Sequence, residues 1–146
     1  MQITTDLSIP GYADEVWAVL ADLSSYPRWN PFIRKVDGEL AEGAAWKAEL
    51  TVDGRVFFNV PTIITELEYG TRLTWRGGLP RLMTGTHSFG VTEALGVVTL
   101  EQIETFSGAL VPIIFPLLKP LLTRRFVAMN EALMSEVVRR RVSVQV

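Results

Sequence analysis

The 146-residue sequence contains no cysteine and a single histidine, His87. The absence of cysteine excludes disulfide bonds, thiolate metal sites and a cysteine nucleophile, and it is consistent with a reducing compartment. One histidine without cysteine argues against a zinc or haem site. We therefore expect no metal and no other cofactor.

Long apolar runs are also missing. The most apolar stretch, residues 109–118, contains two prolines and is well short of the roughly 20 residues that cross a bilayer. Residues 1–6 carry neither the cationic segment nor the apolar run of a signal peptide. These features predict a cytoplasmic protein without stable insertion into a membrane.

The sequence also lacks a large excess of either sign of charge. The net charge is −2, so no basic field would attract nucleic acid. Glycine-rich phosphate loops, Gly-x-Ser-x-Gly nucleophile motifs and metal-ligand clusters are not seen in the sequence. Apolar residues make up 48% of the chain, which is typical of a globular protein. The length suits one domain over residues 1–146.

What the sequence does contain is a series of short segments that alternate apolar and polar residues between turns, a pattern typical of β-strands. Predicted strands cover residues 2–9, 33–40, 46–52 and 56–68, a segment around 73–75 that ends at 77–78, and residues 83–92 and 97–107. Asp53-Gly54 predicts a two-residue hairpin turn, and Pro61 predicts a bend or bulge. Short turns between consecutive strands predict antiparallel pairing.

Two segments show helical spacing instead. Residues 13–23 predict a short helix, and Pro27 and Pro31 limit the following segment to a short helical turn. Near the C-terminus, apolar residues recur at intervals of four or three: Leu118, Leu122, Phe126, Met129, Leu133 and Val137. We expect this long helix to place its apolar stripe on the concave face of the sheet, giving an α+β fold.

Four local patterns in this order resemble a known superfamily. They are Tyr26-Pro27-Arg28-Trp29-Asn30-Pro31, Leu73-Thr74-Trp75-Arg76-Gly77, Gly85-Thr86-His87-Ser88-Phe89 and Glu104-Thr105-Phe106-Ser107-Gly108. The chain resembles the START/polyketide cyclase/pollen-allergen (SRPBCC) superfamily, and within it the polyketide cyclase/dehydrase-like branch.

The resemblance implies a helix-grip fold with a cavity. In that fold a curved antiparallel sheet of about seven strands wraps around a long C-terminal helix, with one or two short helices after the first strand. The branch includes aromatase/cyclases, dehydratase-like proteins and lipid carriers, so the resemblance alone does not choose among these functions.

His87 is the most distinctive candidate for a site. Strand alternation places it on the same face as Phe89, which is expected to point inward. A hairpin that turns near Leu95 brings His87 opposite or diagonal to Gln102 and Glu104. Three interpretations remain open: a polar anchor for a ligand, a proton-transfer group with His87 as the only candidate catalytic residue, or an interior histidine with satisfied hydrogen bonds.

Glu104 needs a partner if it points inward, because an unpaired buried carboxylate costs several kcal/mol. The candidate partners are His87, an arginine such as Arg125, and water in the cavity. Further candidates for ligand contact come from the aromatic and apolar residues. They are Trp29, Trp75, Phe89, Phe106, Phe126 and Met129, with Trp46, Asn59 and Asn130 as weaker candidates.

Residues 77–82 and 109–117 are expected to form the mouth of the cavity, with Leu79, Leu82, Leu110 and Ile113 as an apolar rim. The leading interpretation is binding or transport of a hydrophobic small molecule such as a lipid, a polyketide or another aromatic compound. The alternatives are a cyclase/dehydratase-like enzyme that uses the same pocket, and an interaction module that docks a partner or membrane through the rim. We expect a monomer or homodimer.

Overall fold

The computed structural model describes residues 1–52 and 55–144, apart from the side chains of residues 52 and 56–59. The predicted turn at Asp53-Gly54 lies outside the described residues. Seven strands form one antiparallel sheet in the order β1-β7-β6-β5-β4-β3-β2. They are β1 (Gln2–Pro10), β2 (Ile33–Asp37), β3 (Ala45–Val52), β4 (Arg55–Glu68), β5 (Arg72–Leu79), β6 (Met83–Ala94) and β7 (Val97–Ser107).

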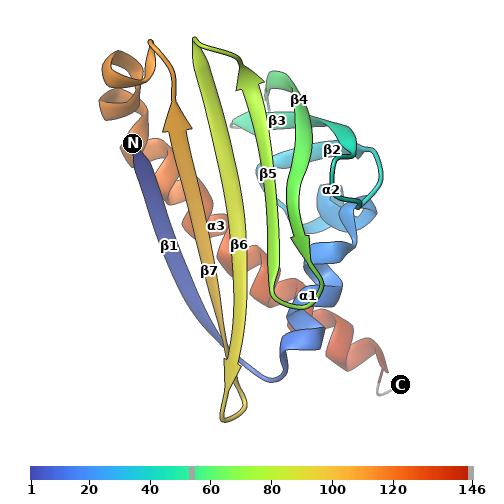
Figure 1. Ribbon diagram of the computed structural model, residues 1–146. Helices are drawn as coiled ribbons and strands as arrows, with labels where there is room; N and C mark the ends of the chain where they lie inside the picture. Colours follow the sequence, from blue (N-terminus) through green and yellow to red (C-terminus); the bar gives the residue numbers. More distant parts are fainter. Residues whose placement is uncertain (53–54, 145–146) are drawn as a thin grey trace.

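The helices gather on one side of this sheet. α1 (Ala13–Ala21), the 3-10 turn η1 (Leu23–Ser25) and α2 (Tyr26–Trp29) follow β1, and α3 (Val111–Val144) ends the described chain. α3 runs diagonally across the sheet and contacts β1, β7 and α1 (Figure 1). This arrangement confirms the expected helix-grip fold with its curved sheet and long C-terminal helix. In the described part of the chain, no helix is long and apolar enough to cross a membrane.

The bends of the sheet lie in its β2–β5 half. Register shifts occur between Ile33 and Lys35, between Leu50 and Thr51, and between Ile64 and Glu66. Each extra residue bends its strand and increases the local twist. Pro61 itself remains in register, opposite Lys47. Pro61 directly precedes Thr62, the first residue of β4 that pairs with β5. At this position, the missing backbone donor of proline is tolerated.

The C-terminal helix begins earlier than its apolar stripe predicts. It starts at Val111 and includes two interior prolines, Pro116 and Pro120. Each proline removes one hydrogen bond to a carbonyl four residues earlier. Two side chains nevertheless hold this segment, because Val111 and Phe115 are buried. The first ten residues of α3 therefore form a helix with weakened backbone hydrogen bonding.

The two halves of α3 differ in how they meet the sheet. Phe126, Met129, Leu133 and Val137 are all buried in the core. Leu118 and Leu122 continue the same stripe but are only half-buried. The C-terminal half of α3 is thus packed, and the N-terminal half leaves space beneath it.

Charged contacts attach the C-terminal end of α3 to the N-terminal helices. Arg140 donates to Asp22 Oδ2 at 2.9 Å, and Arg141 donates to Glu15 Oε2 at 2.7 Å. These bonds hold α3 against the segment that contains α1 and η1. The arginines near the C-terminal end of α3 therefore link these elements, and their positive charge is also favourable near the helix dipole.

Candidate functional site

A cavity of about 360 Å³ lies between the sheet and the N-terminal half of α3. Its volume falls within the range of about 300–1,000 Å³ that is usual for small-molecule sites. Apolar walls come from Trp46 and Ala48 on β3, Trp75 on β5, and Leu118 and Leu122 on α3. Leu79 lines the cavity and is 64% exposed, so the space reaches the surface beside the end of β5.

The polar part of this wall is a pair formed by His87 and Glu104. These residues lie directly opposite each other on β6 and β7, as the predicted hairpin requires. Both are buried, and His87 Nδ1 contacts Glu104 Oε2. The imidazole stacks on Trp75, with ring centroids 4.8 Å apart and planes 4° apart, and it meets the Phe126 ring edge-on. Packing on both sides fixes the orientation of the imidazole.

A chain of hydrogen bonds continues from His87 away from Glu104. Gln102 Nε2 lies 3.1 Å from His87 Nε2, Thr5 Oγ1 donates to Gln102 Oε1, and Asn130 Nδ2 donates to Thr5 Oγ1. An amide nitrogen only donates, so His87 Nε2 accepts and the imidazole proton resides on Nδ1. In this arrangement the imidazole is neutral and donates to the Glu104 carboxylate.

The second carboxylate oxygen of Glu104 has a different environment. Among the described residues, no side chain or backbone group bonds to Glu104 Oε1. This oxygen lies over Gly85, where an added Cβ atom would collide with it. Both residues line the cavity, so the wall carries one carboxylate oxygen that is available as an acceptor.

The predicted site residues separate into two groups. Those that line the cavity are Trp75, His87, Glu104, Phe106, Phe126 and Met129. Phe89 and Gln102 do not line it; the Phe89 ring packs 4.9 Å from the His87 ring, and Gln102 lies behind the imidazole. α1 packs against β6. Trp29 lies on α2 away from the cavity, where its indole donates to Ser25 Oγ.

Thr5 was not predicted from the sequence as part of this network. The signal was present, because Thr5 occupies a buried position of the alternating strand β1, between Ile3 and Ile9. Its register partner on β7 is Gln102. Asn130, predicted only as a weaker lining residue, is buried and donates to Thr5. The side chain of Asn59 lies outside the described part of the chain.

The predicted mouth is only partly at the cavity. Leu79, Leu82, Leu110 and Ile113 are 64%, 47%, 39% and 69% exposed. Gly77, Gly78 and Leu79 line the cavity, but no residue of the segment 109–117 does.

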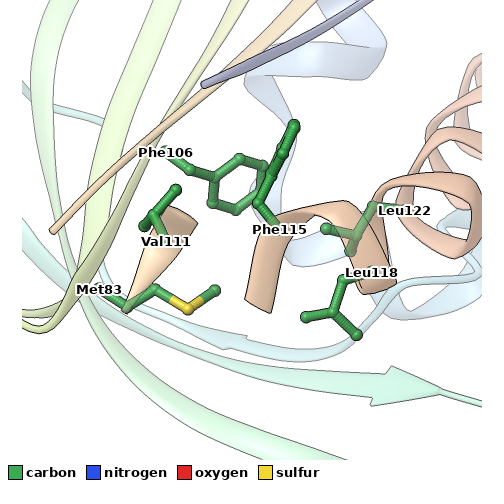
Figure 2. Close-up of a pocket in the computed structure, with 6 residues that line it drawn as sticks. All are labelled: Met83, Phe106, Val111, Phe115, Leu118 and Leu122. Carbon is green, nitrogen blue, oxygen red and sulfur yellow. The ribbon is translucent and has the colours of Figure 1, made fainter. Parts of the chain in front are cut away.

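The beginning of α3 instead borders a narrow space next to the cavity. Figure 2 shows the six residues around it, which come from the start of β6, the end of β7 and the first turns of α3: Met83, Phe106, Val111, Phe115, Leu118 and Leu122. The Phe106 and Phe115 rings lie 5.5 Å apart there. Four of these residues, Met83, Phe106, Leu118 and Leu122, also line the cavity, so this cluster forms its end wall.

Metal binding finds no support in this geometry. In the ranges 1–52 and 55–144, no group of three or more His, Asp or Glu side chains is arranged to hold a metal ion. The cavity offers an apolar surface with one carboxylate–imidazole pair, the Thr62 hydroxyl and the unpartnered Trp46 Nε1.

Comparison with known proteins identifies the family. A sequence profile described as "Polyketide cyclase / dehydrase and lipid transport" matches residues 1–142. The chain belongs to this family. The polyketide cyclase/dehydrase and lipid transport family is the cyclase-like branch of the SRPBCC superfamily that the sequence patterns resemble. No curated protein sequence matches the chain.

Solved structures support the same fold for this family member. A START superfamily protein from Mycobacterium smegmatis has a TM-score of 0.77 at 15% identity, over 94% of this chain and 97% of its own. Norcoclaurine synthase from Thalictrum flavum has a TM-score of 0.71 at 16% identity, over 94% and 92%. The di-domain ARO/CYC StfQ from the steffimycin biosynthetic pathway has a TM-score of 0.73 at 14% identity, over 96% and 51%. At such low identities these similarities show the fold alone.

Proposed function

We propose that this protein binds or carries an apolar small molecule in the cavity between the sheet and α3. The observation that supports this most directly is the contrast between the two halves of α3. Leu133 and Val137 are packed against the core, whereas Leu118 and Leu122 border about 360 Å³ of open space. A domain that needed the helix only for stability would be expected to fill that space to ordinary packing density.

Affinity would come mainly from the apolar walls. Burying one methylene group contributes about 0.8 kcal/mol, so a ligand of ten carbons gains about 8 kcal/mol against a cost of about 4 kcal/mol or more for the loss of its free motion. Trp46 and Trp75, which meet edge to face at 5.2 Å, offer ring surfaces for an aromatic ligand. Access would be beside Leu79, where the cavity reaches the surface.

The experiment is to fill the cavity and measure binding. Ala48 lies on the cavity wall and is 4% exposed, so Ala48→Phe places a ring in the space. Ala41→Phe, at an exposed position before β3, is the matched control. Titration with the neutral fluorescent probe N-phenyl-1-naphthylamine should show binding to wild type and Ala41→Phe and loss of binding to Ala48→Phe. Equal binding to all three proteins, or to none, would contradict the proposal.

A second function is favoured by one specific observation, the His87–Glu104 pair. A carboxylate backed by a neutral imidazole in an apolar space has the geometry of a general base. The protein would then be a cyclase/dehydratase-like enzyme that removes a proton from its ligand. His87→Ala separates the two functions: an enzyme loses turnover beyond any change in substrate affinity, whereas a carrier shows no turnover with or without His87.

A further inference from the structure

We propose that the cavity selects apolar molecules that carry a hydroxyl group over those that carry a carboxylate, and that Glu104 Oε1 is the acceptor that recognises the hydroxyl. This inference rests on the proposed ligand-binding function. It moves the anchor from His87, the most conspicuous residue of the sequence, to the carboxylate beside it.

His87 has no nitrogen left for a ligand. Its Nδ1 donates to Glu104 Oε2, and its Nε2 accepts from Gln102. Gln102 is in turn held by Thr5, and Thr5 by Asn130. Since both ring nitrogens are already paired, a ligand that bonded to His87 would have to break this chain. The imidazole therefore positions Glu104.

Glu104 Oε1 is the acceptor that remains. No group in the described part of the chain bonds to it, and the glycine at position 85 leaves room for it at the wall. Two other polar groups belong to the wall: the Thr62 hydroxyl, which donates to Val60 O at 3.2 Å, and the buried Trp46 Nε1, which has no hydrogen-bond partner among the described residues. A hydroxyl donor on a ligand would complete the hydrogen bonding of a charged oxygen, and such bonds are stronger than neutral ones.

Charge adds discrimination against acids. The described residues that line the cavity include no lysine and no arginine. A carboxylate head group would approach the Glu104 carboxylate without a cation to compensate, and like charges at close range repel. An apolar molecule without any polar group would avoid this repulsion but would leave Oε1 desolvated and unpaired. A hydroxyl compound meets both conditions, because it donates to Oε1 and carries no negative charge.

The test uses three ligands of the same ring system. At pH 7, 2-naphthol, naphthalene and 2-naphthoate would each compete with N-phenyl-1-naphthylamine for the wild-type protein. We expect 2-naphthol to bind roughly 10- to 100-fold more tightly than the other two, as a charge-assisted hydrogen bond implies. Glu104→Gln should remove most of the preference over 2-naphthoate. Glu101→Gln, an exposed position on the same strand, should keep it.

The outcomes distinguish this inference from the function on which it rests. Binding of the fluorescent probe with equal affinities for 2-naphthol and 2-naphthoate would overturn the selectivity and leave the binding function intact. A preference that survives Glu104→Gln would overturn the role of Glu104. Failure of the probe and all three ligands to bind would overturn both. If Glu104→Gln does not fold, Gly85→Ala tests the same contact, because its methyl group displaces Oε1 while the charge remains; it should reduce the preference for 2-naphthol over naphthalene.

Discussion

Substitution of Gly85 by alanine tests the site with a single methyl group. A Cβ atom at this position would collide with Glu104 Oε1, and Cδ of the same side chain would lie within 3.4 Å. Gly85 is not among the glycines with positive φ, so its backbone accepts alanine without strain. The substitution therefore acts on the end of the Glu104 side chain, which must shift, and we expect the carboxylate to leave its place beside His87.

The expected magnitude follows from two opposing terms. Loss of a hydrogen bond to a charged group removes about 1.5–3 kcal/mol. Alanine in place of glycine returns about 0.4–1 kcal/mol, because it restricts the unfolded chain. The net result is a loss of about 0.5–2.6 kcal/mol in the free energy of unfolding. In a domain of this size the melting temperature should fall by about 1–10 °C.

Gly90 on the same strand is the matched control. An added Cβ atom there would meet Glu101 Cβ at 3.9 Å, an ordinary van der Waals contact. Gly90→Ala should leave the melting temperature unchanged or raise it slightly. Both variants contain the single histidine of the chain. The imidazole signals in an NMR spectrum therefore come from His87 alone and report on the site without further resonance assignment. In wild type and Gly90→Ala the proton should be on Nδ1, and Gly85→Ala should alter both nitrogen shifts.

The reasoning would be refuted by a Gly85→Ala protein that is as stable as Gly90→Ala and gives the same imidazole resonances. That result would mean that Glu104 adapts to the methyl group without leaving His87. It would also remove the argument that glycine at position 85 reserves space for the carboxylate.

The remaining predictions concern α3. Pro120→Ala restores a backbone donor, so it should raise the melting temperature and slow ligand release in stopped-flow displacement; unchanged values would show that the proline does not weaken the helix. The hydrogen bond from Arg139 lowers the pKa of Glu136 to about 2. The resulting stabilisation is present above its ordinary pKa of 4.5 and is lost as the pH falls toward 2. Between pH 5 and 2, the free energy of unfolding should therefore fall less for Glu136→Gln than for wild type. The difference should be at most about 3 kcal/mol, and smaller because water screens the exposed arginine. Leu133→Ala should destabilise the core by about 2–5 kcal/mol, whereas Leu122→Ala, which borders open space, should cost clearly less and change ligand affinity; equal costs would indicate a filled cavity.

Periodicity was sufficient for the parts of the fold that depend on which face of an element is buried. Spacings of four and three predicted the stripe from Phe126 to Val137, and strand alternation with a hairpin near Leu95 predicted that His87 lies opposite or diagonal to Gln102 and Glu104; the register pairs it with Glu104. The order of these elements also resembled one superfamily, and that resemblance implied the curved sheet and the cavity.

The start of α3 could not be predicted in this way. Prolines at positions 116 and 120 argue locally against a helix, and the segment is helical because Val111 and Phe115 are buried against the end of the sheet. Local propensity was overridden by tertiary packing. The composition of the network was also hidden, since Thr5 and Asn130 are 125 positions apart and meet only in the folded chain.

The unequal treatment of the two Glu104 oxygens argues that the polar cluster serves a molecule outside the chain. A buried carboxylate costs several kcal/mol of desolvation unless hydrogen bonds compensate it, so such a group is a poor device for stability alone. Here residues from β7, β1 and α3 form the hydrogen-bonded chain that orients the His87 imidazole on β6 toward Oε2. The network leaves two acceptors without a partner among the described residues: Glu104 Oε1 at the cavity wall and the buried Asn130 Oδ1. Its own hydrogen bonds therefore do not satisfy all of its members. This chain fixes one oxygen firmly and leaves the other, beside Gly85, for a donor that the described residues do not provide.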